Sequence, residues 1–349
     1  MLIAFFVNAM EDEYPHYTTT VLAHEAARRG HDVCYVTPGD FVLSPDDAMR
    51  VHARFVPPAK TKSRTRAKFF KDIQSIDKTR LVDITDIDVL MLRSDPSDDA
   101  TERPWAQDVG IQFGRRAAQR GVLVLNDPGA LSQAINKLYF QSFPRQVRAE
   151  TLITRFPADI KDFAKKHNGK VVLKPLQGSG GQGVFLVNGK SGSNLNQMID
   201  AISRDGYIIA QAYVPEAEKG DIRLFLMNGL PLCVDGEYAA MRRISSKDDI
   251  RSNIHAGGTA KAVKITERQL GVAELIRPKL IEDGMFLVGI DIIGDTILEV
   301  NVFSPGNLHS CSELAGVNFA AAIAQSIERK VGIAAEFPGH FSNRSLAVM

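Results

Sequence analysis

Short apolar runs alternate with amphipathic helical segments over roughly the first 125 residues. The runs, each predicted to be a buried strand, occupy residues 2–7, 32–37, 89–92 and 122–125. Helical periodicity separates them over residues 18–29 and 105–120, and glycines at 30 and 121 stand where helix C-caps belong. Strands that alternate with helices favour an α/β domain built on a doubly wound parallel sheet.

The pattern changes after residue 126, where strands often follow one another without an intervening helix. Helices are predicted near residues 130–140 and 194–203, and strands over residues 150–154, 170–174, 184–187, 207–213, 223–227, 232–234, 285–293 and 297–303. This succession is typical of a largely antiparallel α+β arrangement. We therefore expect an N-terminal α/β domain, two α+β subdomains and a tail, over residues 1–125, 126–206, 207–333 and 334–349.

The composition excludes several classes of protein. The 349 residues include 42 Lys and Arg against 41 Asp and Glu, a balance that disfavours nucleic-acid binding by bulk electrostatics. No apolar run approaches the length of a membrane span, and the N-terminal residues show no basic leader. The three cysteines have no paired spacing, so neither a disulfide framework nor a cysteine zinc site is expected. We expect a cytoplasmic protein with small-molecule partners.

A glycine-rich segment at residues 178–183 is the first candidate for ligand binding. It fits the G-x-G-x-x-G pattern, but a strand rather than a helix is predicted after it, which disfavours a dinucleotide site. A P-loop also fails, since five residues separate Gly183 from Gly189 where that motif needs four. A glycine-rich turn between antiparallel strands is typical of a flap that binds triphosphate through backbone N–H groups, with an unliganded hairpin as the alternative.

Lys174 ends an apolar strand just upstream of this segment. An ammonium there needs an anionic partner unless the side chain reaches water, and phosphate would supply the charge. The neighbouring glycines therefore favour the phosphate interpretation.

Polar side chains interrupt the apolar hairpin predicted over residues 285–303. Glu299 and Asn301 are two residues apart on one strand and so share a face, while Asp291 lies on the other strand. Two carboxylates and an amide oxygen suit Mg²⁺, and a half-exposed hairpin with a solvated polar face is the alternative. A two-residue turn would place Asp291 and Glu299 on opposite faces, so we predict a three-residue loop, Gly294-Asp295-Thr296.

In this order, these segments resemble the ATP-grasp ligases and, among them, the bacterial glutathione synthetases. The resemblance covers about residues 1–330 and rests on motifs that include Arg93-Ser94-Asp95-Pro96, Asn126-Asp127-Pro128, Asn136-Lys137-Leu138, Leu173-Lys174-Pro175-Leu176, Gly220-Asp221-Ile222-Arg223 and Glu299-Val300-Asn301. It implies a pre-ATP-grasp α/β domain followed by a two-subdomain ATP-grasp fold, with ATP between the subdomains.

The resemblance also implies roles for individual residues. Phosphates would be bound by Lys137, Lys174, Gly178, Ser179, Gly180 and Gly181, adenine by Gln211, Ala212, Tyr213 and Val214, and ribose by Asp221. Two Mg²⁺ ions, or Mn²⁺ in their place, would be bound by Asp291, Glu299 and Asn301. The catalytic cations would be Arg223 and Lys174.

The implied reaction converts a carboxylate into an acyl phosphate, which an amine then attacks to form an amide. The resemblance suggests γ-glutamylcysteine as the acid, glycine as the amine, and a homo-oligomer. Substrates would be bound by Arg93, Arg243, Arg251 and Asn253, and beside the amine by Ser304, Pro305 and Gly306.

Two alternatives remain open: a ligase of this architecture that joins another acid and amine, and a nucleotide-binding protein without catalysis. A sugar- or nucleotide-binding module on the N-terminal sheet would leave everything after residue 126 unexplained.

Overall fold

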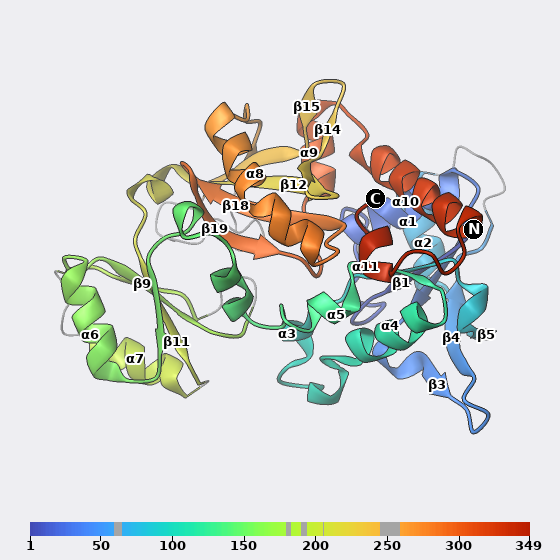
Figure 1. Cartoon of the computed structure of the whole chain (residues 1–349), viewed down its shortest axis with the longest axis horizontal. Helices are drawn as coiled ribbons and strands as arrows, with labels where there is room; N and C mark the ends of the chain where they lie inside the picture. Colours follow the sequence, from blue (N-terminus) through green and yellow to red (C-terminus); the bar gives the residue numbers. More distant parts are fainter. Residues whose placement is uncertain (59–64, 179–182, 190–193, 205, 245–258) are drawn as a thin grey trace.

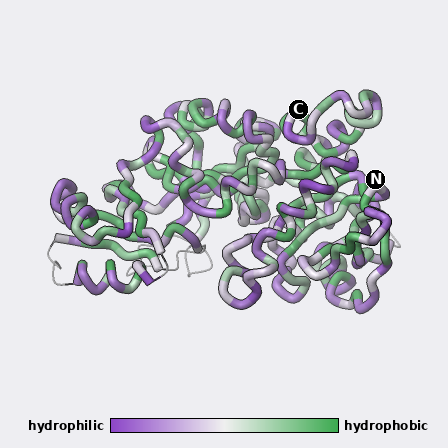
Figure 2. The backbone as a smooth tube through the Cα atoms, turned by 60° about the horizontal axis from the view of Figure 1, so that its bottom comes forward, coloured by the Kyte–Doolittle hydropathy of each residue, from purple (hydrophilic) through white to green (hydrophobic). Residues whose placement is uncertain are grey.

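The computed structural model describes residues 1–58, 65–178, 183–189, 194–204, 206–244 and 259–349. Three sheets follow one another along the long axis of the molecule (Figure 1), an N-terminal sheet at one end, an antiparallel sheet at the other, and a third sheet between them. Hydrophobic stretches of the chain lie mainly inside each part, and hydrophilic stretches gather on its outer turns (Figure 2).

The N-terminal sheet has a parallel centre, as the sequence predicts. Its parallel strands, in spatial order, are β2 (Asp32–Val36), β1 (Leu2–Phe6), β6 (Val89–Leu92) and β7 (Leu123–Leu125). The main helices are α1 (Thr18–Arg28), α2 (Arg66–Gln74) and α4 (Val109–Gln119). The helix predicted from residue 105 begins later, at Val109, because Pro104–Ala106 forms a separate 3-10 turn.

An antiparallel extension of this sheet was not predicted. Its strands are β3 (Phe41–Leu43), β4 (Met49–Phe55) and β5 (Arg80–Asp83). In β4 the buried residues Met49, Val51 and Ala53 alternate with more exposed polar ones. Such a strand lacks the continuous apolar run on which the other predictions relied.

The second sheet is antiparallel throughout, in the order β10-β9-β11-β8. Its strands are β8 (Thr151–Thr154), β9 (Val171–Pro175), β10 (Phe185–Val187) and β11 (Ile208–Ala212), and its helices are α6 (Pro157–Lys166) and α7 (Leu195–Ser203). The helix predicted near residues 130–140 is wrong. The short α5 (Pro128–Leu131) ends early, and the Asn136 side chain caps a separate 3-10 helix, η4 (Lys137–Ser142).

The third sheet is antiparallel and contains the predicted hairpin. Its strands are β12 (Asp221–Met227), β13 (Leu230–Pro231), β16 (Ala240–Ile244), β17 (Thr259–Lys261), β18 (Leu287–Ile293) and β19 (Thr296–Asn301), and α8 (Glu267–Glu282) belongs to the same part. A small hairpin, β14 (Cys233–Val234) with β15 (Glu237–Tyr238), extends from it. All seven residues of β18 are buried, which explains their almost unbroken apolar sequence.

The β18–β19 hairpin keeps the predicted pairing through a different loop. Ile293 pairs with Thr296, so the turn has two residues and the predicted three-residue loop is wrong. The register then shifts between Asp291 and Ile292, which leaves Leu298 unpaired on β19 and sets Asp291 opposite Glu299. A β-bulge therefore supplies the extra residue that brings the two carboxylates onto one face.

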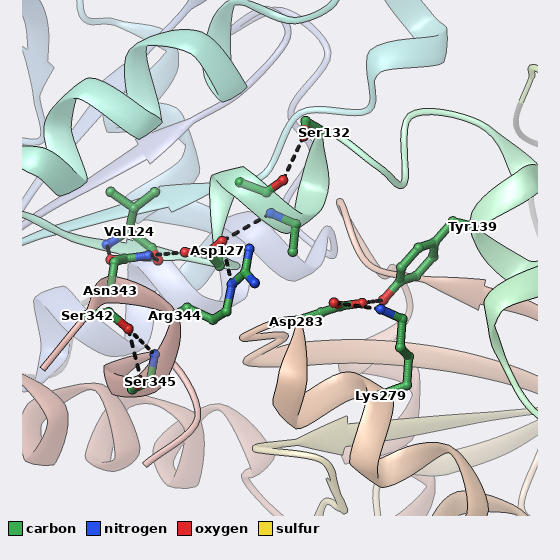
Figure 3. A network of polar contacts seen from close by, with 12 residues as sticks. Val124, Asp127, Ser132, Tyr139, Lys279, Asp283, Ser342, Asn343, Arg344 and Ser345 are labelled. Atoms are coloured by element: carbon green, nitrogen blue, oxygen red, sulfur yellow. Dashed lines mark hydrogen bonds and ion pairs between the residues drawn. The ribbon is translucent and has the colours of Figure 1, made fainter.

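The C-terminal segment returns to the N-terminal domain. After α9 (Leu308–Ala315), helix α10 (Phe319–Glu336) packs beside α1 and runs across the boundary expected at residue 333. The short α11 (Asn343–Leu346) follows, and the Asn343 side chain bonds the backbone of Val124 at the edge strand β7 (Figure 3). Within the described residues, no helix has the combination of length and apolar character that crossing a membrane requires.

Candidate active site

A cleft lies between the second and third sheets, with the N-terminal domain along one side. The second sheet contributes Lys174 and Gln211, and the third contributes the end of β19 from Leu298 to Asn301 with the following residues to Ser304. The remaining wall comes from Asp95–Ser97 after β6 and from Asn136, Lys137 and Tyr139 in the connecting segment. All three parts of the chain therefore meet at one cavity.

Two lysines give this cleft a strong positive charge. Lys174 on β9 donates to Gln211 Oε1 at 3.1 Å, and Lys137 at the start of η4 donates to the backbone carbonyl of Gly178. Burial lowers the pKa of Lys174 to about 8, Glu299 acts against this shift, and Lys137 adds to it. Burial likewise lowers the pKa of Lys137. Two partly desolvated ammonium groups side by side favour binding of a polyanion.

The opposite wall carries the acidic and amide side chains. Glu299 and Asn301 line the cleft, and Asn301 Nδ2 lies 3.4 Å from Asp291 Oδ2 and 3.3 Å from the carbonyl of Gly289. Among the described residues no group of three His, Cys, Asp or Glu side chains could hold a metal ion. A hard cation in the cleft would therefore depend first on the carboxylate and amide oxygens of Glu299 and Asn301, which suit Mg²⁺. Asp291, the third predicted ligand, lies outside the cleft lining with both oxygens hydrogen-bonded to Arg223.

Behind this wall, cross-strand pairs form a buried charge cluster. Arg223 on β12 lies opposite Asp291 on β18 and donates to both carboxylate oxygens, at 2.5 and 2.9 Å. Arg243 on β16 lies opposite Asp221 and forms an ion pair with it. The same guanidinium also lies near the first pair, with Nη2 2.7 Å from Asp291 Oδ2. Burial would raise the pKa of Asp291, but the two arginines lower it to about 2. The cluster holds two cations and two anions.

The loop after β19 joins this cluster to the N-terminal domain. Arg223 Nη1 donates to the carbonyl of Gly306 at 3.2 Å, and Arg93 Nη2 donates to that of Pro305 at 3.1 Å. Arg93 Nε also donates to Thr19 Oγ1 at 3.3 Å. Arg93 is only 5% exposed, and burial lowers its pKa to about 10, although the negative charge of Glu13 acts against this shift. Its hydrogen-bond partners among the described residues are neutral oxygens, so an anion bound there would stabilise it.

The structure sorts the predicted site residues into groups. The cleft is lined by Lys137, Lys174, Gly178, Gln211, Glu299, Asn301 and Ser304. The charge cluster and its loop contain Arg93, Arg223, Arg243, Asp291, Pro305 and Gly306. Asp221 is buried against Arg243, and Ala212, Tyr213 and Val214 lie at and beyond the end of β11, outside the cleft lining. Ser179, Gly180, Gly181, Arg251 and Asn253 lie outside the described residues.

Sequence reasoning missed several residues that line the cleft. Thr151 at the start of β8 accepts from Gln211 Nε2 at 3.3 Å, and Tyr139 donates to Asp283 at 2.8 Å (Figure 3). Thr151 had no detectable signal, since a threonine in a strand is ordinary. Tyr139 was hidden in a segment predicted to be a regular helix.

Comparisons with known proteins agree with this geometry. A family model described as "Prokaryotic glutathione synthetase, N-terminal domain" matches residues 1–132, and one described as "Prokaryotic glutathione synthetase, ATP-grasp domain" matches residues 136–316. Glutathione synthetase of Gloeobacter violaceus is 33% identical over 321 residues, which cover 91% of this chain and 93% of that protein. The enzyme of the same name from Brucella melitensis is 32% identical over 315 residues, with coverage of 90% and 93%.

Solved structures of more distant proteins share the fold. D-cycloserine synthetase DcsG superposes with a TM-score of 0.58 at 14% identity, covering 94% of this chain and all of that one. The macrocyclase MdnC of Microcystis aeruginosa MRC, bound with its precursor peptide MdnA, gives a TM-score of 0.61 at 12% identity, with coverage of 94% and 100%. At such low identity these similarities concern the fold alone.

Proposed function

The chain belongs to the prokaryotic glutathione synthetase family and is an ATP-dependent, amide-forming ligase, and we propose that it joins γ-glutamylcysteine to glycine. The cleft is the observation that supports particular residues as the ATP and metal ligands of this ligase. On one wall Lys137 and Lys174 supply positive charge for phosphates, and on the other Glu299 and Asn301 supply oxygen ligands for a metal ion. A metal-bound polyphosphate requires both.

Nucleotide and metal would divide the cleft between them. We propose that Lys137, Lys174 and the glycine segment from Gly178 to Gly181 hold the phosphates, while Gln211 and the residues to Val214 meet the adenine. Members of this family use ATP and divalent metal ions. Two Mg²⁺ ions would be held by Asp291, Glu299 and Asn301, and Mn²⁺ could replace them. Bound there, the ions would offset negative charge on the transferring phosphoryl group.

The cations beside the cleft would bind the acyl phosphate and the substrates. We propose that Arg223 neutralises the transferring phosphoryl group, because it lies between the carboxylate of Asp291 and the loop at Gly306. Arg93 would bind a substrate carboxylate, because its buried guanidinium has neutral hydrogen-bond partners. The amine would lie against Ser304, Pro305 and Gly306, where the close backbone suits glycine.

We also propose that the enzyme acts in the cytoplasm, since its reaction consumes ATP, and that it is a homo-oligomer, as the family resemblance implies. Light scattering on the purified protein tests the second statement directly.

The substrate assignment is tested by ADP release from the purified enzyme with Mg-ATP. We expect rapid release with γ-glutamylcysteine plus glycine, little when either is omitted, and a tripeptide product detectable by mass spectrometry. The Glu299→Gln variant should lose this turnover, and Glu282→Gln, on the exposed end of α8, should retain it. Turnover only with another acid and amine would refute the glutathione assignment and leave the ligase intact. Tight ATP binding without turnover for any pair would refute catalysis.

A further inference from the structure

A second basic group lies beyond the charge cluster, at the far end of the loop that follows β19. Arg66, in the first turn of α2, lies with Nη2 2.9 Å from Nε2 of His309, which belongs to the first turn of α9. Among the described residues, Arg66 has no carboxylate within ion-pair distance. Glu313 Oε1 lies 3.3 Å from the same histidine nitrogen, but that side chain is 67% exposed, so solvent screens its charge.

In this pairing His309 Nε2 accepts from Arg66, and the polar groups left for a ligand are donors. Because the guanidinium donates to Nε2, His309 carries its proton on Nδ1, which is a second donor. One guanidinium N–H is used in this contact, and among the described residues the others have no hydrogen-bond partner and remain for a ligand. A planar carboxylate matches such a fork of donors.

The Arg66–His309 pair adjoins the substrate loop through α1. The backbone N–H of Leu308, next to His309, donates to Thr18 Oγ1 at 3.3 Å. Arg93 donates to the adjacent Thr19. Two consecutive threonines in the first turn of α1 therefore make the connection. Thr18 accepts from the start of α9, beside His309, and Thr19 accepts from Arg93, which is assigned above to a substrate carboxylate. Helices α1 and α9 both begin here, and the dipoles of their N-terminal turns add positive potential.

Among the described residues, the carboxylates of the proposed reaction outnumber the arginines that are free of a carboxylate partner in the cluster and its loop. The acid brings one carboxylate to be activated and one that does not react, and the amino acid brings a third. Arg223 and Arg243 already face Asp291 and Asp221, so within the described part of the cluster Arg93 is left for one substrate carboxylate. In extended γ-glutamylcysteine the two carboxylate carbons lie about 9 Å apart by standard bond lengths. The contacts of Thr18 with Leu308 and of Thr19 with Arg93 hold His309 and Arg93 at the same turn of α1, so the pair neighbours the arginine assigned to a substrate carboxylate.

We propose that Arg66 and His309 form a binding site for the non-reacting α-carboxylate of the glutamyl group, and so determine which acids the ligase accepts. This inference rests on the proposed function. An acid without that carboxylate would leave the guanidinium unpaired and bind more weakly.

The test compares two acids on two variants. Binding is measured by calorimetry to the enzyme saturated with a non-hydrolysable ATP analogue and Mg²⁺, using γ-glutamylcysteine and 4-aminobutyryl-cysteine, which lacks only the α-carboxylate. Replacing a charged hydrogen-bond donor typically weakens binding about 10- to 100-fold. We expect Arg66→Ala to show that loss for γ-glutamylcysteine and none for the analogue. Arg66→Lys should recover part of it. Lys68→Ala removes an exposed charge from the same helix and should change neither.

Equal losses for the two acids, or no loss for either, would overturn the assignment, because the effect would then not depend on the α-carboxylate. Steady-state kinetics separate this from the wider proposal. If the unaltered enzyme releases no ADP with γ-glutamylcysteine and glycine, the proposed function fails. If turnover is normal and KM for ATP rises in Arg66→Ala as much as KM for the acid, only the Arg66–His309 assignment fails.

Discussion

Replacing Lys174 by methionine should make the protein more stable and at the same time impair its binding of ATP. Burial lowers the pKa of this lysine from 10.5 to about 8. At pH 7 the side chain is charged in both the folded and the unfolded chain. A difference of that size between the two states costs the folded protein about 3 kcal/mol. The cost is fully present below pH 8 and disappears as pH rises toward 10.5.

Methionine removes this cost and fills similar space with a flexible apolar chain. The variant loses the hydrogen bond to Gln211, worth about 1 kcal/mol, so the free energy of unfolding should rise by about 2 kcal/mol. In the same variant the phosphates lose a charged donor, which should weaken ATP binding about 10- to 100-fold.

The assays are urea unfolding at pH 7 without nucleotide, and calorimetry with Mg-ATP. Lys166→Met is the matched control, because that lysine is 62% exposed in an ion pair with Glu150, and its loss should change the free energy of unfolding by less than about 1 kcal/mol. A fall in stability of Lys174→Met, or ATP affinity within threefold of the unaltered protein, would show that Lys174 is not a desolvated phosphate ligand.

Three further outcomes follow from the same geometry. Because phosphate should raise the depressed pKa of Lys174, ATP affinity should fall as pH rises through 8, approaching about tenfold per unit, with proton uptake measurable by calorimetry in two buffers and absent from Lys174→Met. Gly289→Ala would place a methyl group 2.9 Å from Pro305 and 3.2 Å from Arg223, so kcat should fall at least tenfold for a stability loss of about 1–3 kcal/mol, whereas Gly271→Ala, with open space around it, should leave kcat unchanged. Asn343→Ala removes hydrogen bonds to the edge strand β7 and to Asp127, so it should lower the free energy of unfolding by about 1–3 kcal/mol in urea with little change in KM for ATP; an unchanged midpoint would mean that α11 does not stabilise the domain (Figure 3).

Local pattern in the sequence predicted most of the buried strands, the change from parallel to antiparallel parts, and the candidate phosphate and metal ligands. The buried strands at residues 2–6, 89–92 and 287–293 were predicted because apolar side chains along them have no other role than burial. Lys174 and the pair Glu299 and Asn301 were recognised for the converse reason, since charged groups in apolar strands need partners. Each of these signals can be read within a few consecutive residues of the sequence.

Only the tertiary structure decided how those groups meet. The bulge at Leu298, not the length of the turn, sets Asp291 opposite Glu299. The partners of Arg243 and Arg93 come from neighbouring strands and from the loop at Pro305, which is 212 residues from Arg93. The Asn126 side chain bonds the backbone of Leu287 and Val302, 161 and 176 residues away, and so joins the N-terminal domain to the hairpin. Such contacts leave no periodic trace, because a hydrogen bond depends on the positions of two atoms in space and not on their separation along the chain.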